Sequence, residues 1–164
     1  MAGELSSVTF HAADPAVTRS WLRSDDPAVL GRLAIIVRTG GDGSAAGLWR
    51  DDDGGQRFVH LGSGSGSTLA CILATSPVDF LLFLAIGFPE PCWNEDLGRS
   101  PAEVAIRNRE TGYEPPCLSR SFIERHFGVT IPAVASEIVS SVAHFGDVAS
   151  PDPFCDWLAE LQDD

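Results

Sequence analysis

The chain has 164 residues, of which 44% are hydrophobic, so it is long enough for one globular domain with a single core. The chain contains no Lys, and its formal net charge is −12. This charge predicts an acidic surface that repels phosphate backbones, which argues against direct nucleic-acid binding. The longest apolar stretch, residues 80–86, is far shorter than the roughly 20 residues that span a bilayer, and the first ten residues do not resemble a signal peptide. We therefore expect a cytoplasmic protein that does not enter a membrane.

Five helix starts share one pattern, in which a capping side chain precedes a Pro at the first helical position. The cap oxygen accepts an N–H that has no partner in the helix, and Pro lacks only an N–H that would stay unpaired. The pairs are Asp14-Pro15, Asp26-Pro27, Ser76-Pro77, Ser100-Pro101 and Asp152-Pro153. They predict helices over 15–23, from 27 onward, and over 77–86, 101–111 and 153–161.

Strands are expected between the second and third of these helices. The apolar run 33–37 fits either a strand or a helix end, because its periodicity does not separate the two. A Gly-rich loop over 40–47 follows. Turn residues then delimit strands at 47–50, 56–61 and 68–74, with a hairpin turn at 51–55 that contains two glycines.

The helix over 77–86 is apolar on every side, which indicates a buried core helix. It should end at Gly87, since two prolines follow at once. Two more helices are expected over 121–127, opening at Ser121, and over 132–143, which would bury Val134, Ile138 and Val142. The sequence shows no repeat and no linker. It predicts one α+β domain over residues 1–164, with helices flanking a small, largely antiparallel sheet.

Three motifs suggest a chemical function, but a structural role is favoured for each. The glycine-serine run 62–67 precedes a strand and lacks the Lys of a phosphate loop. The acidic turn 51–54 begins like a calcium loop, yet position twelve of that loop would be Gly62 instead of Glu. His60 is more typical of a sheet histidine than of a general base, and its pairing with Cys71 as a catalytic dyad is the alternative.

No metal or cofactor is expected. The four cysteines lie 21, 25 and 38 residues apart, so none forms the closely spaced pair of a structural zinc site. Without a secretion signal, reduced thiols are expected, mostly in the core.

The loop over 89–96 combines prolines, one aromatic residue and three acids directly after the buried helix. Loops on a rigid scaffold often carry recognition residues, and Trp is a common interface anchor, although Trp93 would equally well fold back onto the core. The acidic hairpin turn forms a second exposed acidic segment. Together the two segments give the predicted partner-binding set: Asp51, Asp52, Asp53, Glu90, Trp93, Glu95 and Asp96.

One stretch, residues 47–87, carries a family resemblance. It contains Gly47-Leu48-Trp49, the strand end Val59-His60-Leu61-Gly62-Ser63, and the helical segments 76–81 and 84–87. These segments resemble the SMI1/KNR4 (SUKH) superfamily, and the run 126–132 resembles its bacterial members. The resemblance covers about a quarter of the chain, and the segment before residue 30 departs from the acidic-aromatic N-terminal helix of the family.

The resemblance implies an α+β fold and, in many bacterial members, a cytoplasmic immunity protein that neutralises a cognate toxin, often a nuclease. A fungal branch acts as a regulatory scaffold. The family shares no catalytic residues, and its toxin contacts vary, so no residue's role carries over. We therefore expect a non-enzymatic immunity-type protein whose carboxylates and Trp93 contact a basic toxin domain. The alternatives are a regulatory or scaffold module of the same fold, or a small-molecule enzyme built around His60 and the cysteines.

Overall fold

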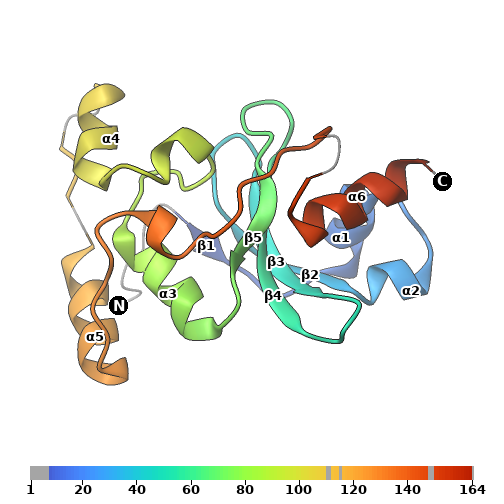
Figure 1. Ribbon diagram of the computed structural model, residues 1–164, viewed down its shortest axis with the longest axis horizontal. Coiled ribbons are helices and arrows are strands. Elements are labelled where there is room, and N and C mark those ends of the chain that lie inside the picture. The colour runs from blue at the N-terminus through green and yellow to red at the C-terminus, as the bar shows by residue number, and fades with distance from the viewer. Residues whose placement is uncertain (1–7, 110–111, 115, 148–149, 164) are drawn as a thin grey trace.

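The computed structural model describes residues 8–109, 112–114, 116–147 and 150–163 (Figure 1). Its five strands form one antiparallel sheet in the order β1-β2-β3-β4-β5, so each strand pairs with its neighbours in sequence. The strands are β1 (Thr9–Phe10), β2 (Leu33–Arg38), β3 (Ala45–Arg50), β4 (Gln56–Leu61) and β5 (Ala70–Ala74). The helices are α1 (Pro15–Leu22), α2 (Pro27–Leu30), α3 (Pro77–Ile86), α4 (Pro101–Arg107), α5 (Cys117–Phe127) and α6 (Pro153–Asp163), with the 3-10 helices η1 (Asn94–Asp96) and η2 (Ala135–Glu137). The predicted α+β class is confirmed.

All five predicted cap-and-Pro starts are helix starts in the structure. Asp14 accepts the Ala16 N–H at 2.8 Å, and Asp152 accepts the Phe154 N–H at 3.0 Å. Ser100 forms a complete capping box with Glu103. These starts are local features of the sequence, which is why they could be predicted without knowing the tertiary contacts.

Helices cover both faces of the sheet (Figure 1), with α3, α4 and α5 on one side and α1, α2 and α6 on the other. The α3 side has a core of aliphatic and Phe side chains, in which Phe83 and Ile86 of α3 pack with Leu73 of β5. The α6 side is aromatic at its centre, where the Trp49 ring lies 5.4 Å from Phe154 and 5.7 Å from Trp157. The predicted burial of the 77–86 helix is confirmed, and it ends at Gly87 with φ of 92°.

A bulge in β2 lets that strand contribute to both cores. Ile35 and Val37 are two residues apart and would share a face in a regular strand. The register with β3 shifts between them, so Ile35 packs on the α6 side and Val37 on the α3 side. The apolar run whose structure the sequence left open is therefore a strand that serves both faces.

The predicted helix over 132–143 is wrong, because only Ala135–Glu137 forms a short 3-10 turn. The chain after it pairs with the start of β5 instead. The Ala70 N–H donates to Ala143 O at 2.8 Å, and the Phe145 N–H donates to Thr68 O at 2.9 Å. Val142, expected in the core, is 41% exposed.

Smaller differences concern the ends of elements. Helix α5 begins at Cys117 instead of residue 121, and α4 ends at Arg107, while residues 110–111 of its predicted range lie outside the described part. Strand β3 begins at Ala45, β5 begins at Ala70, and β1 was not predicted. Within the described ranges, no helix has the length and apolar character that crossing a membrane requires.

Candidate functional site

The two predicted acidic segments lie at opposite ends of the sheet. The 51–55 turn precedes β4 and the 62–67 turn follows it, so a six-residue strand, about 20 Å long, separates them. The loop 88–96 belongs to the second end, where Ser67 Oγ donates to the carbonyl of Cys92. The seven predicted residues therefore do not form one site.

At the hairpin end, two of the three aspartates are exposed. Asp51 is held inside the turn, where it pairs with Arg57 at 2.9 Å and accepts the Gly55 N–H, leaving its side chain 14% exposed. Asp52 pairs with Arg32 at 2.9 Å but is 91% exposed. Asp53 is exposed and forms no ion pair within the described residues. Asp51 is a turn-stabilising residue, and only Asp52 and Asp53 present carboxylates to solvent.

In the loop 88–96 the predicted residues have different surroundings. Glu90 Oε1 accepts the Gly41 N–H at 2.9 Å, so it holds the β2–β3 loop. Trp93 is half-buried, while Glu95 is exposed. Asp96 is only 2% exposed and pairs with Arg107; burial raises the pKa of its carboxyl, although the Arg107 charge opposes that shift. The expectation that Asp96 faces a partner is therefore not met.

Asp42, which the sequence analysis did not single out, organises this same end of the sheet. Its carboxylate accepts the N–H and the hydroxyl of Ser44 at 2.8 Å, and the Ser63 hydroxyl and Ser67 N–H at 3.0 Å. Partial burial alone would raise the pKa of this carboxyl, but the hydrogen bonds outweigh it and the pKa is lowered. The carboxylate thus ties the β2–β3 loop to the glycine-serine turn.

Asp42 explains one glycine of the glycine-serine turn, Gly66, whereas Gly62 lies against the Ser67 backbone and Gly64 has a φ of 78°. A Cβ on Gly66 would lie 2.7 Å from the Asp42 carboxylate, closer than side chains can approach. The serines of the turn supply the donors. The run therefore encloses a carboxylate of the chain itself, and the only signal for this in the sequence is an Asp within the neighbouring Gly-rich loop.

His60 and Cys71 lie opposite each other on β4 and β5, but both side chains are fully buried. His60 Nδ1–H donates to Leu69 O at 2.9 Å, and Nε2 accepts the Thr39 hydroxyl at 3.0 Å. Burial lowers the pKa of His60 to about 4 and raises that of Cys71 to about 12. Both ring nitrogens are hydrogen-bonded and both side chains are buried, so the structure supports the favoured interpretation of His60 as a sheet histidine over the alternative of a catalytic dyad.

The other titratable side chains do not gather into a metal site in the part of the chain that the structure describes, since no three His, Cys, Asp or Glu residues lie together. All four cysteines are free thiols, and only Cys117 is exposed. Burial, with the nearby charges of Asp42 and Glu90, raises the pKa of Cys92 to about 12.

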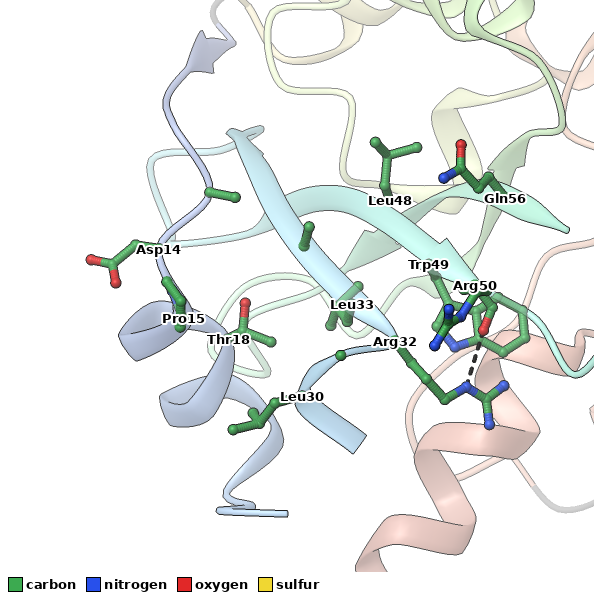
Figure 2. Close-up of a pocket in the computed structure, with 13 residues that line it drawn as sticks. Asp14, Pro15, Thr18, Leu30, Arg32, Leu33, Leu48, Trp49, Arg50 and Gln56 are labelled. Carbon is green, nitrogen blue, oxygen red and sulfur yellow. Dashed lines mark hydrogen bonds between the residues drawn. The ribbon is translucent and has the colours of Figure 1, made fainter. Parts of the chain in front are cut away.

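A cavity of about 400 Å³ opens between α1, α2 and the β2–β3 pair (Figure 2). The Arg32 side chain points from the cavity wall toward α6 (Figure 2), and its Nε–H donates to Arg50 O at 3.0 Å. Its guanidinium carbon lies 5.3 Å from the ring centre of Trp49 and 5.1 Å from that of Trp157, which is the geometry of a cation–π contact. The buried Trp49 Nε1–H has no acceptor among the described residues. The polar groups here mainly join the hairpin to α6.

A larger hollow of about 750 Å³, here called the α1/α6 groove, lies between α1, α6 and the turn after β4. Its apolar lining consists of Trp21, Leu22, Phe145, Leu158 and Leu161. Trp21 and Phe145 stack with their ring centres 6.5 Å apart and remain half-buried. The groove was not predicted from the sequence, because it depends on the tertiary pairing of α6 with α1.

The fold and these surfaces define an α+β protein of net negative charge that has two structured loop ends and, in the part that the structure describes, an open groove between α1 and α6. No family model, curated protein or solved structure matches the chain. The resemblance to the SMI1/KNR4 superfamily stays a prediction.

Proposed function

We propose that this is a non-enzymatic immunity-type protein that binds a basic toxin domain in the cytoplasm and blocks its active site or substrate groove. The observation that carries the proposal is the set of exposed carboxylates that form no ion pair within the described residues. It includes Asp53, Glu95, Asp156 and Glu160. These charges, in a chain of net charge −12, complement a basic surface.

A nuclease fits this charge pattern, since its substrate groove is positively charged to hold a phosphate backbone. Long-range attraction would raise the rate of encounter, and it would weaken as salt screens the charges. Short-range apolar contacts would then set the lifetime of the complex.

The test is co-expression with the toxin-like protein encoded beside this chain. We expect the neighbour alone to stop growth, the pair to grow, and the two proteins to co-purify. A neighbour that is not toxic but still co-purifies would favour the regulatory or scaffold alternative. Growth arrest that this chain does not relieve, with no complex formed, would contradict the proposal.

A further inference from the structure

Two Asp-Gly pairs occur in the chain, Asp42-Gly43 and Asp53-Gly54. Aspartate isomerises most readily before glycine, because the backbone nitrogen that follows it is then unhindered by a side chain. That nitrogen attacks the neutral side-chain carboxyl group, a C–N bond forms, and the carboxyl OH leaves with the amide proton as one water. Water then opens the resulting succinimide ring at either carbonyl and gives aspartate or isoaspartate.

The two pairs have the same local backbone. Both glycines have a positive φ, 97° at Gly43 and 80° at Gly54. Both glycine amides also close a tight turn, since the Gly43 N–H donates to Gly40 O at 3.4 Å and the Gly54 N–H donates to Asp51 O at 3.1 Å. The attacking nitrogen is therefore no freer at Asp53, and the local turn does not favour reaction there.

The two carboxyl groups have opposite surroundings. Asp42 is half-buried, and its carboxylate accepts two hydrogen bonds from Ser44, one from Ser63 and one from Ser67. Reaction at Asp42 requires these bonds to open first. Against the effect of burial, they also lower the pKa of this carboxyl, which keeps it in the unreactive charged form. The Asp53 side chain is exposed and forms neither an ion pair nor a hydrogen bond with the residues that the structure describes.

The space around Gly54 is open as well, because a Cβ built there would meet no atom within 4 Å. We propose that Asp53 is a site of spontaneous isomerisation to isoaspartate, and that Asp42, in the same dipeptide, is protected by its serine donors. The product carries a free α-carboxylate, which is the group that an isoaspartate-specific methyltransferase esterifies with S-adenosylmethionine. This inference is independent of the proposed function, since the reaction needs no partner.

The product would alter the hairpin turn. In isoaspartate the main chain runs through Cβ, so the turn between β3 and β4 gains one carbon. The present turn is closed by the Asp51 N–H, which donates to Gly55 O at 2.9 Å, and by the ion pair of Asp51 with Arg57. A longer turn does not fit this closure, so we expect the modified chain to hold its hairpin carboxylates in different positions.

The two sites can be measured separately in one sample. Trypsin cleaves after Arg, so it releases Asp42 on the peptide 39–50 and Asp53 on the peptide 51–57. The folded full chain is incubated at pH 7 in water labelled with heavy oxygen, and liquid chromatography with mass spectrometry measures isoaspartate and label in each peptide. We expect at least about tenfold more isoaspartate at Asp53 than at Asp42.

Incubation in urea removes the folded contacts, so the ratio of the two sites should then fall toward one. Ser63→Ala removes one donor and should raise isoaspartate at Asp42 about fivefold without changing Asp53. Asp53→Glu, whose longer side chain closes the ring poorly, should remove the signal of its peptide. Thermal unfolding checks that both variants are folded. Equal isoaspartate at the two sites of the folded chain would overturn the proposal, as would a ratio that urea leaves unchanged.

Discussion

The two ends of the sheet both carry aspartates in glycine-rich loops, but they use them in opposite ways. At one end, Asp42 accepts four hydrogen bonds from serines and joins two loops without an Arg partner. At the other, Asp51 and Asp52 pair with arginines and Asp53 is left to solvent. An acidic composition therefore describes two different things, an internal acceptor and a surface charge. Only the second kind is available to a partner.

The largest expected effect concerns His60, which lies at the Asp42 end of β4. Because burial lowers its pKa to about 4, the unfolded chain takes up a proton near pH 6.5 while the folded chain does not. The contribution of His60 to the free energy of unfolding is complete above pH 6.5, and about 3 kcal/mol of it is lost as the pH falls to 4. Urea unfolding at pH 7, 5.5 and 4.5 measures the free energy of unfolding at each pH. His60→Gln should flatten this part of the pH dependence and His126→Gln should not; an equal slope in all three proteins would contradict the prediction.

Next in size is Asp42→Ala, which leaves four donors without their acceptor. We expect the free energy of unfolding to fall by about 2 kcal/mol, since the loop can rehydrate in part. The matched variant Asp53→Ala, at the other end, should change it by less than about 0.5 kcal/mol. Chemical denaturation compares the two. Equal effects would remove the distinction between the ends.

Within the hairpin end, Asp51→Ala should lower the free energy of unfolding by about 1 kcal/mol, because it breaks a partly buried ion pair and a turn hydrogen bond. Asp52→Ala loses only an exposed pair and should cost less than half of this. The same denaturation series tests both. A larger loss for Asp52 would show that its contact with Arg32 supports the Trp49–Trp157 cluster.

The smallest expected effect is kinetic. Asp52→Asn with Asp53→Asn should slow association with the basic partner about threefold at low salt and leave it nearly unchanged at high salt, because screening removes the attraction. The control is the double variant Glu114→Gln, Glu137→Gln, which removes two negative charges at other places on the protein. Stopped-flow or surface-plasmon measurements give the rates. A rate equal to that of the control would mean that the hairpin has no special role in encounter.

Sequence reasoning succeeded where the signal is local. A capping oxygen and a following Pro are neighbours in the chain, so all five such helix starts could be predicted. The apolar run of α3 likewise determined its burial. These features need no knowledge of what packs against them.

Sequence reasoning failed where a distant strand or helix determines the structure or burial of a segment. The run 132–143 has helical spacing, yet pairing of Ala143 and Phe145 with the start of β5 overrides it. Asp53 and Asp96 look alike as acids in polar loops, but Arg107 and the packing around η1 place only Asp96 in the interior. The role of Asp42 and the existence of the groove depend on segments far apart in sequence.

The sequential order of the five strands also bears on how the protein is made. The β2–β3, β3–β4 and β4–β5 pairs can each form once the second strand has been synthesised, because short loops join them, whereas α1 and α2 lie between β1 and β2. The groove is different, since Trp21 and Leu161 are about 140 residues apart in the chain. A nascent chain acquires its sheet early and its groove only with the last helix. On this order of events, a truncated product would retain most of the strand pairing while lacking the groove.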